Sequence, residues 1–375
     1  MAKVSIVVPF HNSEGYIDRC MNSLLNQTIG LQNLELILVD DASTDGTLDL
    51  LKAYEKKYPK QIILIPCVQN GRQGRARNIG LQYATAPYVG FMDSDDWIEA
   101  DMYEKMYKKI TRYHCDIVHC RHIRNDGTSI IIDSRNEEGK EGKEKKESEE
   151  AEENKGIKGK EQDKIFEKST GKQDAIITIE DDKQREKFLV SDVMGVGVWD
   201  KLYRRELIMD NKIVFPEGLA YEDICFGAMM YLYAKKIYIL EERLYHYYVN
   251  WESTVLKMNQ PYHLDIFKVN EMKWQEYEER GALKRFPMAV KYDFVKCYYL
   301  AGMKMLLLRY TKPSYEAFLH IKQRVWELTG DYKENPYLKN AFPAVYDNLL
   351  KLLDVNISEE ELWQLADTMK QMANL

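Results

Sequence analysis

The chain has 375 residues, 45% of them hydrophobic and 30% charged, so it is long enough for two domains and is no small disulfide scaffold. The excess of 60 Asp and Glu over 53 Lys and Arg argues against nucleic acid as a partner, because binding to a phosphate backbone needs a basic face. Apolar runs such as residues 4–8 are far shorter than the roughly 18 residues of a membrane span, and Met1-Ala2-Lys3 shows no signal-peptide pattern, so we expect a cytosolic protein.

Short apolar runs alternate with helical patterns up to Cys120, which is typical of an α/β fold with a parallel sheet flanked by helices. We expect strands at residues 4–8, 34–39, 62–65, 88–92 and 116–120. The apolar spacing over residues 17–25 predicts a helix with Asn12 or Ser13 as its N-cap. A second helix is expected after Ser43-Thr44, and a third one turns Ala76, Ile79 and Tyr83 inward.

Polar segments follow three of these strands, at residues 9–14, 40–46 and 93–97. Ligands of parallel sheets bind outside the carboxyl ends of the strands, where these segments lie. Asp40 ends a buried strand and therefore needs a partner or a ligand. Asp93 and Asp95 project to the same side of an extended backbone, which predicts a site for one divalent cation, although a capped turn is the simpler alternative.

Residues 70–78 form a basic, glycine-containing segment that we expect to be a flexible loop leading into the third helix. Arginines and helix N-terminal amides suit phosphate, although solvated arginines on an ordinary loop would read the same way. A dinucleotide-dependent oxidoreductase is excluded, because its glycine-rich turn should follow the first strand, where this chain has residues 9–14.

Residues 134–164 have 20 charged side chains among 31 and no aromatic residue, so this insertion cannot bury a core. It is either a solvated segment or a docking tail. Beyond about residue 259, helical patterns dominate, with breaks at Pro287, Pro313 and Pro336. The apolar stretch 298–308 either packs inside a helical bundle or rests on a membrane surface.

Taken together, these motifs resemble the family 2 glycosyltransferases, which have a GT-A fold with a Rossmann-like, nucleotide-binding mixed sheet. The resemblance implies a catalytic domain at residues 1–255, interrupted by the insertion at about 134–175, and a helical region at 256–375. It rests on these segments: Val4-Ser5-Ile6-Val7-Val8-Pro9-Phe10-His11-Asn12, Val39-Asp40-Asp41-Ala42-Ser43-Thr44-Asp45-Gly46-Thr47, Ala76-Arg77-Asn78, Phe91-Met92-Asp93-Ser94-Asp95-Asp96-Trp97, Val198-Trp199-Asp200-Lys201-Leu202 and Tyr221-Glu222-Asp223.

The resemblance also implies a role for individual residues. Asp40 would accept the imide N–H of a uracil-type base, and Arg72 or Arg77 would lie near the base or diphosphate. Asp95 would be the principal ligand of Mn2+ or Mg2+, with Asp93 facing the ribose and the metal. The remaining expected nucleotide-sugar contacts are Pro9, His11, Glu14, Asn70 and Ser94, with His11 and Arg72 standing where many relatives have Tyr and Gly.

Asp223 would be the general base, although the Glu222-Asp223 pair could instead be an acidic helix start that favours the helix dipole. His246 is either a further metal ligand or a structural histidine. The implied reaction is inverting transfer of a sugar from a nucleotide-sugar donor, expected to be UDP-linked, to a saccharide or lipid-linked saccharide used in surface polysaccharide assembly, with peripheral membrane association as an option. A catalytically silent nucleotide-sugar-binding relative and a sugar nucleotidyltransferase are the alternatives.

Overall fold

The computed structural model describes residues 1–125, 130–131, 173–250, 256–338 and 344–373. The core of the fold is a mixed sheet in the order β3-β2-β1-β4-β9-β6-β10-β5, with β7 and β8 paired at its margin. The charged insertion predicted at about 134–175 lies almost entirely outside the described residues. The strands are β1 (Val4–Phe10), β2 (Leu34–Asp40), β3 (Ile62–Pro66), β4 (Tyr88–Phe91), β5 (Trp97–Ile98), β6 (Ile117–Asn125), β7 (Ile130–Ile131), β8 (Ala175–Thr178), β9 (Lys201–Arg204) and β10 (Lys236–Tyr248).

The five predicted strands are confirmed, and the pairs β1–β2, β1–β4 and β2–β3 are parallel. The mixed sheet that the resemblance implies is confirmed, because β9 is inserted antiparallel between β4 and β6. β5 also pairs antiparallel with β10. These pairings join segments from opposite sides of the insertion, which local periodicity does not reveal.

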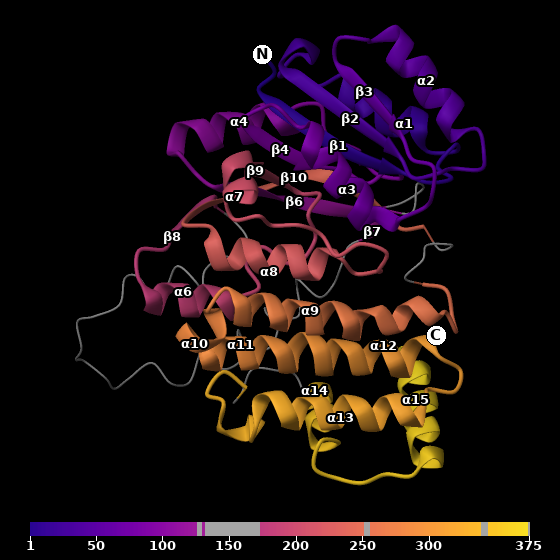
Figure 1. Cartoon of the computed structure of the whole chain (residues 1–375), viewed down its shortest axis with the longest axis vertical. Coiled ribbons are helices and arrows are strands. Elements are labelled where there is room, and N and C mark those ends of the chain that lie inside the picture. The colour runs from indigo at the N-terminus through magenta and orange to yellow at the C-terminus, as the bar shows by residue number, and fades with distance from the viewer. Residues whose placement is uncertain (126–129, 132–172, 251–255, 339–343, 374–375) are drawn as a thin grey trace, which may run out of the picture.

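Helices cover both faces of the sheet (Figure 1). Successive residues of β1 alternate between two cores: Ile6 and Val8 belong to the core that contains side chains of α1 and α4, whereas Val7 belongs to the core that contains side chains of α3 and α8. This alternation follows from the two-residue repeat of a strand. The helices before residue 234 are α1 (Ile17–Leu25), α2 (Thr47–Lys57), α3 (Arg72–Tyr83), α4 (Met102–Tyr113), α6 (Asp182–Leu189), α7 (Arg205–Asp210) and α8 (Asp223–Tyr233), with the 3-10 turn η1 (Leu31–Asn33).

Three local expectations about these helices are wrong. Tyr16, not Asn12 or Ser13, is the N-cap of α1, because a turn at residues 13–16 precedes the helix. The expected loop at 70–78 is helical from Arg72 onward. Tyr83 is 47% exposed and does not turn inward, since α3 approaches the sheet through its small residues, such as Ala76 and Gly80.

The C-terminal helices stack in layers beneath α8, on the face of the sheet that α3 also covers (Figure 1). Tyr298, Met303 and Leu307 are fully buried, so the stretch 298–308 packs inside the bundle. Every helix in the described part of the chain is too short or too polar to cross a membrane. The boundary at residue 256 stays a prediction. These elements are η3 (Pro261–Leu264), α9 (Asp265–Glu279), α10 (Ala282–Arg285), α11 (Pro287–Phe294), the π-helical η4 (Val295–Ala301), α12 (Gly302–Arg309), α13 (Tyr315–Thr329), η5 (Tyr332–Glu334), α14 (Ala344–Lys351) and α15 (Glu359–Met372).

Candidate active site

The loops after β1, β2 and β4 meet at one edge of the sheet, as the sequence predicted. Phe10 lies opposite Asp40 in the parallel β1–β2 pair, and β4 runs parallel to β1 on its other side. Pro9 is buried within β1, directly before the first of these loops. The polar segments that follow the three strands therefore line a common edge.

The first two loops are held together by hydrogen bonds. The backbone N–H of Asn12 donates to Ser43 Oγ at 3.0 Å, and that of Gly46 donates to Glu14 Oε2 at 2.9 Å. His11 is exposed, and its Nδ1 lies 2.9 Å from the carbonyl oxygen of Asp41. Asn12 has a positive φ of 50°, a conformation that costs energy and is found preferentially at functional sites.

Asp40 ends β2 with a carboxylate that is only 1% exposed. Its Oδ2 accepts one long hydrogen bond, from the Ser43 backbone at 3.3 Å, while no donor among the described residues reaches the buried Oδ1. The next carboxylate is satisfied, since Asp41 Oδ1 accepts from the backbone N–H of Gly71 at 2.8 Å. A buried carboxylate oxygen without a donor is costly, so Asp40 has the capacity to bind an N–H or O–H group of a ligand.

The start of α3 borders the same edge. Asn70 is exposed and its side-chain amide donates to the Asp41 carbonyl at 3.3 Å. Arg72 has a φ of +64° and a half-buried side chain, which lies over the ring of Tyr262 at 5.3 Å and 4.0 Å from Asp265 Oδ2. Arg72 is therefore connected to the first turns of the C-terminal helical region.

Arg77, one turn and a half further along α3, is almost completely buried. Its Nη2 donates to Asp93 Oδ1 at 2.7 Å, and its Nη1 donates to Glu222 Oε1. Burial alone would lower the pKa of Arg77, but the charges of Asp93 and Glu222 raise it above its ordinary value. Gly74 allows α3 to lie close to the segment before α8, because a Cβ at this position would lie 2.1 Å from the carbonyl oxygen of Pro216. The guanidinium thus joins the end of β4 to the start of α8.

The loop after β4 contains three carboxylates with different surroundings. Burial and the neighbouring charge of Asp93 raise the pKa of Asp95 to about 6. Ser94 Oγ lies 2.8 Å from Ser13 Oγ, which ties this loop to the one after β1. The third carboxylate, Asp96, is occupied by hydrogen bonds within the protein, so Asp93 and Asp95 are the candidates to bind a cation. Hard divalent ions prefer such oxygen ligands.

Asp96 was not singled out by the sequence, yet it organises this loop. It is fully buried and accepts hydrogen bonds from Tyr245 Oη at 2.5 Å and from the Tyr248 backbone at 2.7 Å. Tyr245 Oη in turn accepts from the backbone N–H of Asp93 at 3.2 Å. The only available signal was the aromatic run at the end of β10, where a buried phenol needs a polar partner.

His246 lies beside this loop, where its ring stacks on Trp97 at 4.9 Å and its Nε2 lies 2.7 Å from Glu99 Oε1. In the described part of the chain, no three His, Cys, Asp or Glu side chains are grouped closely enough to hold a metal ion by themselves. The pair Asp93 and Asp95 still fits a Mg2+-like or Mn2+-like ion, because such ions are commonly held by one or two carboxylates together with substrate phosphates.

Asp223 is the first residue of α8, next to the Glu222 that binds Arg77. Burial and the charge of Glu222 raise the pKa of Asp223 to about 7. A carboxylate with that pKa can take up a proton near neutral pH, which suits a general base. The guanidinium of Arg77 therefore lies between Asp93 and Glu222, the residue that precedes Asp223.

A family model described as glycosyl transferase family 2 matches residues 5–182. The chain is 32% identical over 248 residues to the poly(ribitol-phosphate) beta-glucosyltransferase of Bacillus spizizenii, covering 66% of this chain and 32% of that protein. It is 28% identical over 248 residues to the poly(ribitol-phosphate) beta-N-acetylglucosaminyltransferase TarS of Staphylococcus aureus, covering 66% of this chain and 35% of that protein. The chain thus spans about a third of the length of these curated relatives.

Solved structures agree on the fold. The crystal structure of S. aureus TarS 1–349 in complex with UDP-GlcNAc superimposes with a TM-score of 0.53 and 21% sequence identity. The match covers 90% of this chain and 93% of the TarS chain. The predicted architecture, a GT-A sheet flanked by helices and followed by C-terminal helices, is therefore confirmed.

Proposed function

We propose that this chain, whose residues 5–182 match the family model described as glycosyl transferase family 2, transfers a sugar from a UDP-linked donor to a hydroxyl group of a saccharide. The observation that carries the proposal is the Arg77 bridge, which connects Asp93 at the end of β4 with Glu222 beside Asp223. Direct displacement at an anomeric carbon needs a base for the acceptor hydroxyl and a counter-charge for the leaving diphosphate. The two ends of the bridge supply candidates for both.

The nucleotide would bind over the loops that follow β1, β2 and β3. The unsatisfied Oδ1 of Asp40 is suited to accept the imide N–H of uracil, a donor that adenine does not offer at an equivalent position. Pro9, His11, Glu14 and Asn70 border the same edge. The TarS structure with UDP-GlcNAc supports a UDP-linked donor for a chain of this fold.

Asp95 and Asp93 would hold Mn2+ or Mg2+, with diphosphate oxygens and water completing the coordination. A bound divalent ion would stabilise the negative charge that develops on the leaving UDP. The carboxylate of Asp93 keeps one oxygen engaged by Arg77 and has the other for this role. Arg72 has a partly exposed guanidinium at the start of α3 and is the better candidate for a diphosphate contact, because Arg77 is committed to two carboxylates.

Asp223 would accept the proton of the acceptor hydroxyl while the new glycosidic bond forms and the bond to UDP breaks, with inversion at the anomeric carbon. The acceptor we propose is a surface polysaccharide or a lipid-linked saccharide, handled at the inner face of the membrane. The named action of the relatives on poly(ribitol phosphate) supports a cell-surface polymer.

Thermal unfolding with a panel of UDP-sugars, with and without Mn2+, tests this function. The wild-type protein is expected to be stabilised by UDP and a cognate UDP-sugar, and the stabilisation should increase with Mn2+. The Asp95→Asn variant should keep its unliganded melting temperature and lose the increase due to Mn2+. An unchanged Mn2+ effect in Asp95→Asn would rule out the assigned metal ligand, while binding without UDP release would identify a catalytically silent relative.

A further inference from the structure

A second group of ionisable and aromatic side chains lies at the same edge of the sheet, on the far side of β4 from β1. β9 runs antiparallel to both β4 and β6, so its first residue, Lys201, lies beside the end of β4. β6 runs parallel to β4 and extends past this edge as far as Asn125. We call Trp199, Asp200, His119, His122 and Tyr247 the His122 cluster.

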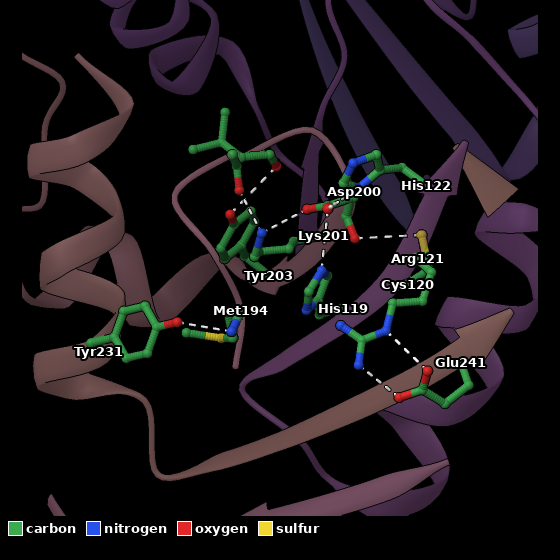
Figure 2. Close-up of polar contacts among 12 residues, drawn as sticks. His119, Cys120, Arg121, His122, Met194, Asp200, Lys201, Tyr203, Tyr231 and Glu241 are labelled. Carbon is green, nitrogen blue, oxygen red and sulfur yellow. Dashed lines mark hydrogen bonds and ion pairs between the residues drawn. The ribbon is translucent and has the colours of Figure 1, made fainter. Parts of the chain in front are cut away.

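Asp200 is the buried centre of the His122 cluster, with 3% of its surface exposed. Its carboxylate contacts Lys201 Nζ at 2.6 Å, His119 Nε2 at 3.1 Å and His122 Nδ1 at 3.4 Å, and these side chains converge on it in Figure 2. Burial alone would raise the pKa of Asp200, but Lys201 and His119 lower it well below its ordinary value. Asp200 is therefore ionised and holds the ring of His122 through Nδ1.

Of the two histidines that contact Asp200, His122 is the one that reaches solvent, since 40% of its side chain is exposed. Because His122 Nδ1 faces the Asp200 carboxylate, Nε2 lies on the opposite side of the ring and points away from it. In the tautomer that has its proton on Nδ1, Nε2 carries the acceptor lone pair. The Trp199 ring fixes the imidazole from the side in an edge-to-face contact at 4.8 Å. His122 thus presents an oriented hydrogen-bond acceptor beside an aromatic surface.

The aromatic part of the cluster is connected to the loop after β4, which contains Asp93 and Asp95 and is called the metal loop below. Trp199 stacks on Tyr245 at 4.5 Å and lies 5.5 Å from the ring of Tyr247. Tyr245 is the buried residue whose hydroxyl contacts Asp96 and the backbone of Asp93. Trp199 and Tyr247 are themselves only partly buried, so they offer a flat apolar face one ring away from that loop.

The loop that leads to Trp199 also packs against α8, the helix that begins with Asp223. A Cβ on Gly227 would lie 3.4 Å from the carbonyl oxygen of Val196, so this loop packs against the first turns of α8. Gly227 follows Asp223 by four residues and is therefore about one helical turn away on the same face. The His122 cluster consequently lies between the metal loop and the helix that starts with Asp223.

We propose that the His122 cluster is the binding subsite for the acceptor. Trp199 and Tyr247 would stack on the apolar face of a saccharide ring, and His122 Nε2 would accept a hydrogen bond from one of its hydroxyl groups. An aromatic surface with one convergent polar group is typical of small-molecule subsites. This inference rests on the proposed glycosyl transfer and adds the residues that would bind the ring of the saccharide acceptor.

Acceptor kinetics with a panel of methyl glycosides and the donor that the wild-type protein uses tests the subsite. His122→Phe keeps a ring but removes the acceptor nitrogen, and Trp199→Leu removes the flat face. Each is expected to raise the KM for the methyl glycoside about tenfold, equivalent to about 1.4 kcal/mol, with the donor KM within twofold of wild type. His320→Phe and Trp326→Leu, at exposed positions of α13, are the matched controls and should leave both KM values unchanged.

An acceptor KM within twofold of wild type in both cluster variants would overturn the proposal. Where Trp199→Leu lowers the melting temperature, Tyr247→Leu tests the same surface from β10. An NMR titration of the UDP-bound protein with the same methyl glycosides measures binding without turnover. A wild-type protein that releases UDP from no donor would refute the proposed transfer, and the titration would still decide whether the cluster binds a saccharide.

Discussion

Replacing Arg77 with methionine tests whether one buried guanidinium holds the two ends of the site together. The side chain is 3% exposed, and its two terminal nitrogens bind Asp93 and Glu222. Methionine preserves an unbranched apolar stem next to Phe215 but leaves Glu222, which is 6% exposed, without its cation. Removing one partner of a buried ion pair costs about 3–5 kcal/mol, because the other charge stays desolvated.

Urea unfolding at pH 7.5, followed by tryptophan fluorescence, measures this cost. Arg77→Met should lower the free energy of unfolding by about 3–5 kcal/mol, and the double variant Arg77→Met/Glu222→Gln should recover at least half of the loss. Arg75→Met is the matched control, because Arg75 lies on the same helix and is partly exposed, and it should change stability by less than about 0.5 kcal/mol. A loss below about 1 kcal/mol for Arg77→Met, or no recovery in the double variant, would refute the bridge.

Three further predictions concern individual side chains. With a pKa of about 7, Asp223 is mostly protonated at pH 6 and mostly ionised at pH 8, so kcat/KM should rise about tenfold between them, and a flat pH profile would contradict its role as base. Asp40→Ala should weaken UDP binding at least about tenfold in calorimetry, since it removes a buried hydrogen-bond acceptor, and an unchanged Kd would disprove the contact between Asp40 and uracil. Tyr221 is two residues before Asp223, and its Oη lies 2.8 Å from Nδ1 of the buried His263. If this contact positions Asp223, Tyr221→Phe should lower kcat about tenfold while the Kd for UDP stays constant. Equal losses in kcat and UDP affinity would exclude such a positioning role.

The strands and their terminal loops could be predicted from sequence because each depends on a local pattern. The apolar run before Asp40 forms β2 and buries that carboxylate, as the sequence suggested. The antiparallel insertion of β9 could not be predicted, since its pairing joins residues separated by the charged insertion. Long-range pairing of this kind is decided by tertiary packing and has no signature of its own.

Side-chain roles were harder to predict than their places. Arg77 reads as a phosphate-binding arginine in sequence, yet burial and two facing carboxylates commit it to Asp93 and Glu222. Asp96 follows two expected ligand residues and resembles them, but it accepts hydrogen bonds from Tyr245 and the Tyr248 backbone. Asp93 is only 16 residues from Arg77, but Glu222 lies 145 residues from Arg77 and Tyr245 lies 149 residues from Asp96. Local spacing could therefore not distinguish binding from structural support.

The most direct test of the proposed transfer is Mn2+-dependent release of UDP from UDP-sugars, measured together with mass-spectrometric detection of the glycosylated saccharide. The account predicts that wild-type protein releases UDP and forms product in equal amounts, that chelation stops both, and that Asp223→Asn binds UDP but forms no product. Product formation at the wild-type rate by Asp223→Asn, or full turnover after chelation, would contradict it.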